Sequence, residues 1–532
     1  MKLKALKPRL FNVMFHTHTV SGIVISFALF VIFYAGAFSL FRHELYQWEN
    51  PLSRFETKKN IDYEATIKFI ENNTKQGNAF RNINIVTPSD ANPFIKFFSS
   101  YKDSLGKNKN ISYYINPHTY EVYKEPNKFS NPKALTYLAD TLYRLHYFRQ
   151  IPFIGRYLSG LVAFFFLFAI VTGILLHWKQ IANKFYNLNV KGKWKQIWTN
   201  SHTVIGTITI PFQFIFALTG AFLCLNIFLL APSAYILFDG DTNEIIKLID
   251  ANAGKKYDKN AKDIKSTKTI NQLYSDITEE YPNHHINRIR ISNFGKEDGA
   301  ISFQIDDERG LLSNGNFMYR YKDGSLIDET IPNKKSYVKA TLGIITKLHF
   351  GNFGGYLLRI IYFILALLTC YVITSGVMIW QTARNNSKYT DKQKRFHHRV
   401  TKFYLAFTSS LFPAVALIFI ANKVIPMAME FRVVYVKNTF FIGWLLFTLL
   451  GLFWNNYSKL NRNYLIIGSV LSLSIPIVNG IVTSDWLWKT LANNQYYVFS
   501  VDFTWFLTGV FGLWIFRNLR KKQSNKKVTR LT

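Results

Sequence analysis

Eight long apolar runs constrain the fold of this chain more than any other feature of its sequence. They lie at about residues 18–41, 157–177, 204–230, 356–380, 403–421, 438–455, 464–482 and 498–516. Each is long enough, as a helix, to cross the roughly 30 Å hydrocarbon core of a bilayer. No small-residue cleavage site follows the first run, so we expect a retained helix rather than a removed signal peptide. The sequence therefore predicts an integral membrane protein, mainly α-helical, with about eight transmembrane helices.

The charged residues indicate parts outside the bilayer and predict the orientation. The chain has 64 Lys and Arg against 32 Asp and Glu, which is too many charges for a bare helical bundle. Basic clusters such as KGKWK, DKQKR and RNLRKKQSNKK lie in the short segments 1–17, 179–200, 381–402 and 517–532. Because short cytoplasmic segments are enriched in Lys and Arg, we expect both termini in the cytoplasm. The charge is thus explained by topology in membrane lipid, and no nucleic acid is expected as a partner.

The first 385 residues contain an internal repeat. At one constant offset, HTVSG at 18–22 aligns with HTVIG at 202–206, and GAF at 36–38 with GAF at 220–222. At a second constant offset, LH at 145–146 aligns with LH at 348–349, Arg156 with Arg359, and TG at 172–173 with SG at 375–376. Each copy consists of a basic lead, a helix, a long segment outside the membrane and a second helix.

The two long outside segments, about 42–150 and 231–350, each predict a small α+β module. In the first, IDYEATIKFIENN has helical apolar spacing, and NINIV, FIKFFSS and SYYINPHTYEVYKE alternate as strands do. In the second, INQLYSDITEEY precedes INRIRIS, AISFQID and FMYRYKDGSLIDE, with a hairpin turn at Asp323-Gly324. We expect a helix and about three antiparallel strands in each module. The last four runs form a separate C-terminal tail without repeat partners.

These patterns divide the chain into consecutive segments. They are the lead and first span (1–41), outside module 1 (42–150), the second span (151–180), a cytoplasmic loop (181–202), the third span (203–230), outside module 2 (231–350), the fourth span (351–384), a basic cytoplasmic loop (385–402), the four-span tail (403–516) and a basic cytoplasmic end (517–532).

Two pairs of histidines occupy equivalent positions in the repeats. His18 and His202 lie at the expected cytoplasmic ends of their spans, and His146 and His349 lie on the outer side, just before theirs. A polar ring at a membrane helix is costly unless it is satisfied, so such residues suggest a functional site. Four imidazoles in two layers match the needs of two b-type haems, each with two histidines on its iron. For any single histidine a headgroup contact or an interhelical hydrogen bond is the simpler role, but the repetition favours haem ligation.

Four further residues are weaker candidates for the haem sites. His177 in LLHWK is the first alternative haem ligand in the cytoplasmic layer if the symmetric pairing is wrong. His43 could replace His146 as a ligand in the outer layer. Neither has a histidine counterpart in the other repeat. Arg156 and Arg359 could pair with haem propionates through guanidinium forks, or could be snorkelling interfacial arginines.

The other histidines and the cysteines are expected to have no part in the site. His284 and His285 lie in the second module, and an adjacent pair is only a weak metal signal. His397 and His398 follow KQKR and are interpreted as part of a solvated basic face. The two cysteines, at 224 and 370, lie within expected spans, which excludes a disulfide framework and a thiolate metal site.

With these motifs the sequence resembles the PepSY-associated transmembrane proteins, iron-regulated membrane proteins that include siderophore-iron reductases of the bacterial inner membrane. The motifs that carry the resemblance are HTHTVSG, YAGAF, FRHEL, SYYINPHTYEVYKE, LHYFRQIPFIGRYLSG and VTGILLHW in the first copy, and SHTVIG, LTGAF, FMYRYKDGSLIDE, LHFGNFGGYLLR and TSGVMIW in the second. The resemblance covers residues 1–385. GNFGG after His349 and the four-span tail depart from the family pattern.

The resemblance implies a four-helix haem-binding bundle, two PepSY-like modules in the periplasm, and haem b as the cofactor. It also implies reduction of a ferric siderophore or another iron chelate, which releases Fe(II) for iron uptake. The family's motif histidines fall on His18, His146, His202 and His349, which would then ligate haem iron.

The sequence contains no motif for binding a nucleotide as the electron donor. GNFGG is the only glycine cluster, and no βαβ pattern surrounds it, so no nucleotide-binding fingerprint is present. The donor is therefore expected to be a separate cytoplasmic reductase or a quinol. The alternatives are a permease for an iron chelate, because repeated spans with polar residues also describe carriers, and a non-redox sensor or peptide-binding protein whose outer modules act alone.

Overall fold

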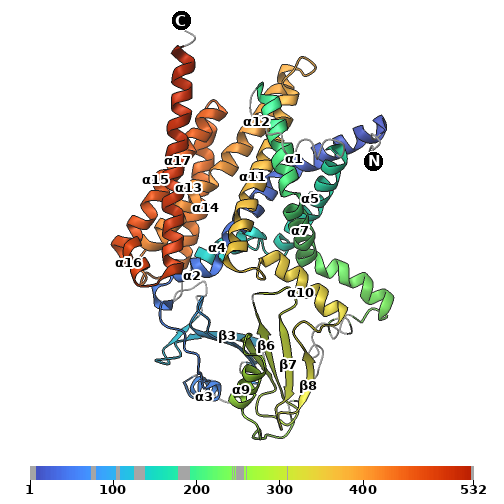
Figure 1. The fold of residues 1–532 in the computed structure, drawn as a ribbon, viewed down its shortest axis with the longest axis vertical. Helices are drawn as coiled ribbons and strands as arrows, with labels where there is room; N and C mark the ends of the chain where they lie inside the picture. The colour runs from blue at the N-terminus through green and yellow to red at the C-terminus, as the bar shows by residue number, and fades with distance from the viewer. Residues whose placement is uncertain are drawn as a thin grey trace. The chain divides into compact units, whose positions relative to one another are not determined.

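The computed structural model forms two compact units. It describes residues 7–73, 80–102, 108–124, 138–177, 192–241, 244, 246, 257–258, 260–307 and 309–528. The helical unit consists of Met1–Pro51, Thr136–Leu225 and Ile360–Thr532, and the sheet unit consists of Leu52–Leu135 and Asn226–Arg359. Both long segments between spans therefore contribute to one sheet unit (Figure 1).

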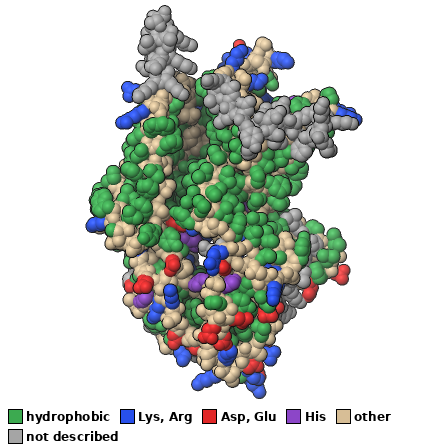
Figure 2. Space-filling model, viewed as in Figure 1, with side chains coloured by type: hydrophobic (Ala, Val, Ile, Leu, Met, Phe, Trp, Pro, Cys, Tyr) green, Lys and Arg blue, Asp and Glu red, His purple; other side chains and the backbone are tan. Residues whose placement is uncertain are grey.

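Eight helices in the described residues are long and apolar enough to cross a membrane, as the sequence predicts. Those of the two repeats are α1 (Pro8–Ser39), α5 (Gly155–His177), α7 (Trp194–Leu237) and α11 (Gly355–Arg384), with short helices α2 (Arg42–Glu49), η1 (Pro51–Ser53) and α4 (Leu138–His146). Hydrophobic side chains cover the outer surface of the spans (Figure 2), as expected of helices that face lipid.

The tail supplies the other four spans. The first of them is formed by α12 (Asp391–Ser409) and α13 (Leu411–Val424), which follow one another across Ser410. A capping box between Thr390 and Gln393 marks the start of α12. Residues 391–402, which the sequence predicts as part of a cytoplasmic loop, are therefore the first turns of this helix. The remaining tail helices are α14 (Arg432–Phe453), α15 (Tyr457–Thr483), the short α16 (Leu487–Ala492) and α17 (Tyr496–Val528).

The tail and the first repeat share one hydrophobic core. Ala35 of α1, Trp48 of α2 and Leu142 of α4 pack in the same cluster as Phe419 of α13 and Trp505 of α17. The sequence predicts a separate tail, because the apolar pattern of a span shows that it is buried but not which neighbour buries it. In the structure the tail is part of the helical unit.

The sheet unit contains one eight-stranded antiparallel sheet with the order β4-β3-β2-β1-β5-β6-β7-β8. Its strands are β1 (Asn82–Val86), β2 (Ile95–Lys102), β3 (Asn108–Ile115), β4 (Val122–Lys124), β5 (His285–Ser292), β6 (Ala300–Asp306), β7 (Gly315–Arg320) and β8 (Leu326–Thr330). The two predicted modules are therefore halves of a single sheet, joined where β1 pairs with β5.

Side-chain alternation explains how the halves join. Ile83 and Ile85 of β1 are paired with Ile291 and Ile289 of β5, and all four are buried. They lie in one core with α3 (Tyr63–Asn73) and α9 (Ile270–Glu280), which cover this face of the sheet. A further helix, α10 (Tyr337–Phe350), follows β8. Because β1 and β5 pair with each other, their apolar residues are not left on an open edge, and the edges of the sheet are β4 and β8.

Candidate functional site

His18 lies on α1, and its ring is oriented by α5. The ring Nδ1 is 2.9 Å from the carbonyl oxygen of Ala169 and 3.3 Å from Thr172 Oγ1. Because a carbonyl oxygen can only accept a hydrogen bond, Nδ1 carries the hydrogen, and Nε2 is the lone-pair nitrogen of the neutral ring. Gly173 allows this close approach, since a Cβ there would be 3.2 Å from His18 Cε1.

His202 on α7 has the same surroundings in the second repeat. Its Nδ1 is 2.9 Å from the carbonyl oxygen of Val372 and 3.0 Å from Ser375 Oγ, both on α11. A Cβ at Gly376 would be 3.3 Å from His202 Cε1. These three residues are the repeat counterparts of the three that surround His18, so the repeat extends to the hydrogen bonds that orient each ring.

The structure brings His18 and His202 together. Their ring centroids are 6.4 Å apart, and the ring planes are inclined by 76°. Bonds between imidazole nitrogen and a metal are about 2 Å long, so two rings that share one metal ion have centroids roughly 6 Å apart. An N–H bonded to a backbone carbonyl is also the usual way in which a metal-bound imidazole is oriented. This pair therefore has the donor chemistry and the ring spacing that a shared metal ion would require.

His146 lies at the end of α4, against α1. Its Nδ1 is 2.8 Å from the carbonyl oxygen of Ile32. The ring fits only because position 36 is glycine, since a Cβ at Gly36 would be 2.7 Å from this Nδ1. Burial lowers the pKa of His146, which keeps the imidazole neutral, as a metal ligand must be.

His349 lies in the last turn of α10, in the sheet unit, whereas His146 belongs to the helical unit. Two residues before it, the buried Lys347 fixes α10 to the connection between β6 and β7. Its Nζ donates to Asp306 Oδ1 at 2.6 Å and to Ser313 Oγ at 2.6 Å. The helix then ends at Gly351, which has the left-handed conformation (φ 68°).

His43 and His177, the two alternative haem ligands, have different surroundings. His43 is exposed in the first turn of α2. His177 is the last residue of α5, and its side chain lies outside the described part of the chain.

The two candidate arginines differ in their contacts, although they are repeat counterparts. Arg156 donates through Nη2 to the carbonyl oxygen of Leu223 on α7. The guanidinium of Arg359 lies 5.2 Å from the ring centroid of Tyr356, on the same helix. A role in binding propionates stays a prediction for both residues.

A buried polar cluster between the first repeat and the tail is absent from the sequence-based predictions. Asp502 of α17 accepts hydrogen bonds from Trp48 Nε1 and from Asn479 Nδ2, each at 2.7 Å. Lys423 of α13 donates to the carbonyl oxygen of Trp48 at 2.6 Å and lies 4.1 Å from the centroid of its ring. Asp502 is the only acidic residue within the apolar runs of the tail, and this was the available signal.

Two comparisons with known proteins complete the description of the site. Among the described residues, no group of three or more His, Cys, Asp or Glu side chains is placed to hold a metal ion. No curated protein matches the sequence. The family model described as the PepSY-associated TM region matches residues 15–382, which is more than half of the chain. The protein is therefore a multi-pass membrane protein of the PepSY-associated TM family.

Proposed function

We propose that the protein is a b-type electron carrier with two haems that reduces a ferric siderophore or another iron chelate. The observation that carries this proposal is the pair His18 and His202. They lie in equivalent settings of the two repeats, with ring centroids 6.4 Å apart and each Nδ1 bonded to a backbone carbonyl. A structural histidine needs no such repetition, whereas a bis-imidazole iron site requires one ring from each side.

The residues beside this pair fit a flat cofactor. Gly22 lies one helical turn after His18, and a Cβ there would meet no protein atom within 4 Å. Its repeat counterpart Gly206, one turn after His202, would meet only Val372 Cγ1, at 3.8 Å. Glycines at these positions leave open space next to the imidazoles, where a macrocycle needs room.

The chain's own residues would bind and orient the cofactor. Haem would supply one-electron redox chemistry, with histidine imidazoles holding its iron. Ala169 and Val372 would hold the two inner rings through their carbonyl oxygens. From the repeat, His146 and His349 are the candidate ligands of the second haem, and Arg156 and Arg359 are candidates for binding propionates.

The proposed arrangement in the cell follows from the basic segments. We place the protein in the bacterial inner membrane, with both termini in the cytoplasm and the sheet unit in the periplasm. Electrons would come from a separate cytoplasmic reductase or a quinol and leave to the iron chelate on the periplasmic side. Hard-oxygen chelators bind Fe(II) more weakly than Fe(III), so reduction would release the metal.

The test is haem content. We expect the detergent-purified protein to show the reduced-minus-oxidised spectrum of a b-type cytochrome, with two haems per chain by the pyridine haemochrome assay. Single substitution of His18, His202, His146 or His349 by Ala should lower this value towards one. His16→Ala is the matched control, since His16 is exposed on α1 and has no histidine counterpart in the other repeat.

The rival functions predict a different result. A permease for the iron chelate or a non-redox sensor would be colourless when purified from haem-replete cells, and that outcome would refute the electron carrier. If His16→Ala lost as much haem as His18→Ala, the ligand assignment would be wrong even with two haems in the wild type.

A further inference from the structure

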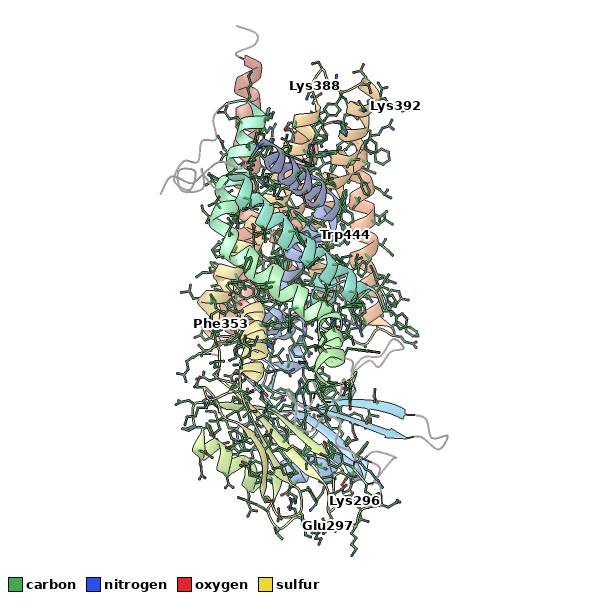
Figure 3. The ribbon with its side chains drawn as sticks, turned by 90° about the vertical axis from the view of Figure 1, so that its right-hand side faces the viewer. Lys296, Glu297, Phe353, Lys388, Lys392 and Trp444 are labelled. Carbon is green, nitrogen blue, oxygen red and sulfur yellow. The ribbon has the colours of Figure 1, made fainter. Side chains whose placement is uncertain are left out.

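A cationic cavity lies at the end of the helical unit where α11 ends and α12 begins. We call this the basic end. The cavity has a volume of about 450 Å³ and is lined by Gln381 and Arg384 of α11 and, on α12, by Lys394, His397, His398 and Arg399. Its size is within the range of pockets that hold small molecules. Figure 3 shows Lys388 and Lys392 at the same end, which adds to the positive charge.

The positive charge of the cavity is largely uncompensated. Asp391 is the only acidic residue between Arg384 and Val424. It is exposed and 3.5 Å from Lys394, which is the one ion pair of a lining residue in the described part of the chain. Several cations that converge on one cavity repel each other, so an anion bound among them is strongly favoured.

Aromatic side chains beside the cavity contact Arg384 and His397. The guanidinium of Arg384 lies 4.8 Å from the ring centroid of Trp380, and its Nη1 donates to the Trp380 carbonyl oxygen at 3.3 Å. The ring of His397 has edge contacts with Trp380 at 5.0 Å and with Tyr389 at 5.5 Å. Its Nδ1 is buried and has no hydrogen-bond partner. The lining therefore contains one guanidinium, that of Arg384, which an aromatic ring and a backbone carbonyl orient.

We propose that this cavity binds a phosphate-bearing anion, supplied either by a soluble nucleotide or by the headgroup of an anionic phospholipid. Arginine forks match the geometry of phosphate oxygens, and Arg384 and Arg399 supply two of them from different helices. The sequence interprets His397 and His398 as a solvated basic face, but both are partly buried and line the cavity.

The cavity is connected to the histidine pair through α11. His202 is hydrogen-bonded to Ser375, and Gln381 lies on the same helix, about 9 Å further along its axis. If the chain carries electrons as proposed above, a redox-active nucleotide in this cavity would lie within electron-transfer range of the inner haem. Only this last step rests on the proposed function, because anion binding itself requires no haem.

The test is protection of Lys394 from acetylation, measured by mass spectrometry on the full chain in phosphatidylcholine nanodiscs. Lys392 lies two residues away, outside the lining, and serves as the internal control. We expect FMN or inorganic pyrophosphate to slow acetylation of Lys394 at least fivefold relative to Lys392 if the source is soluble. Protection by phosphatidylglycerol in the nanodisc, without a soluble probe, would identify a headgroup instead.

Variants show whether the protection is specific. Arg384→Gln and Arg399→Gln should raise the probe concentration for half-protection about tenfold. Arg517→Gln, an exposed cation of α17 outside the lining, should leave it unchanged. The proposal is overturned if no probe protects Lys394, if Lys392 is protected equally, or if Arg517→Gln has the same effect. The readout is independent of haem, so a protein that purifies without haem but whose Lys394 is protected by FMN would refute only the haem electron carrier.

Discussion

Glycines determine where the histidine rings lie. A Cβ at Gly36 would be 2.7 Å from His146 Nδ1, whereas a Cβ at Gly22 would meet nothing within 4 Å. We expect Gly36→Ala to displace the ring from Ile32 and to destabilise the haem-free protein by about 1–3 kcal/mol. Gly22→Ala, in the same helix, should stabilise it by up to about 1 kcal/mol through helix propensity. Thermal unfolding of the two variants in detergent checks this contrast, and equal shifts would contradict it.

A half-buried lysine of the sheet unit predicts a pH dependence. Lys335 donates to Asn314 Oδ1, and burial together with the nearby charge of Lys347 lowers the pKa of Lys335 to about 8. Because the pKa is lower in the folded than in the unfolded chain, the unfolded chain binds more protons between about pH 8 and pH 10. The sheet unit should therefore gain stability as the pH rises through this range. Below about pH 8 the unfavourable contribution of charged Lys335 to the free energy of unfolding does not change with pH.

The measurement is the unfolding midpoint of the full chain as a function of pH, compared with Lys335→Met. From about pH 8 to pH 10, the unfolding midpoint of the wild type should rise relative to that of Lys335→Met. Parallel profiles would show that Lys335 does not titrate in this range.

Among the elements, β1 has the most demanding position, because it joins the two halves of the sheet. Ile85 pairs with Phe97 of β2 on one side and with Ile289 of β5 on the other. Proline removes the backbone N–H that a central strand needs, so we expect Ile85→Pro to cost about 2–4 kcal/mol. The matched control is Ile327→Pro in β8, an edge strand, at a register shift where Ile327 has no paired residue.

Hydrogen exchange shows whether the joint behaves in this way. In Ile85→Pro, protection should fall in both β2 and β5, which belong to different repeats. In Ile327→Pro, it should fall at most locally in β7 and β8. Loss confined to the first repeat would mean that the two halves fold independently.

At the scale of the whole molecule, the carboxylate of Asp502 links the tail with the first repeat. Both oxygens of Asp502 accept hydrogen bonds, from Trp48 on α2 and from Asn479 on α15. In Asp502→Asn one acceptor becomes an NH₂ group that faces a donor, which should cost about 2 kcal/mol. Thr504→Val is the control, because Thr504 is exposed on the same helix. Thermal unfolding in detergent distinguishes the two, and an unchanged midpoint in Asp502→Asn would show that the cluster is not structural.

The sequence by itself determined the elements, because their patterns are local. Apolar runs predicted all eight spans, alternation predicted strands in both outside segments, and the first of the two offsets predicted that His18 and His202 are equivalent. The repeat and its motifs also predicted the family that the family model confirms.

Only the tertiary structure decided which elements meet. The joint between β1 and β5, the shared core of tail and first repeat, the contact of His18 with His202 and the cavity at Arg384 each bring together residues far apart in the chain or on different helices. A period of 2 or 3.6 residues states that one face of an element is buried, but not which surface buries it. That choice depends on how surfaces fit in three dimensions, and side-chain packing across the whole fold determines it.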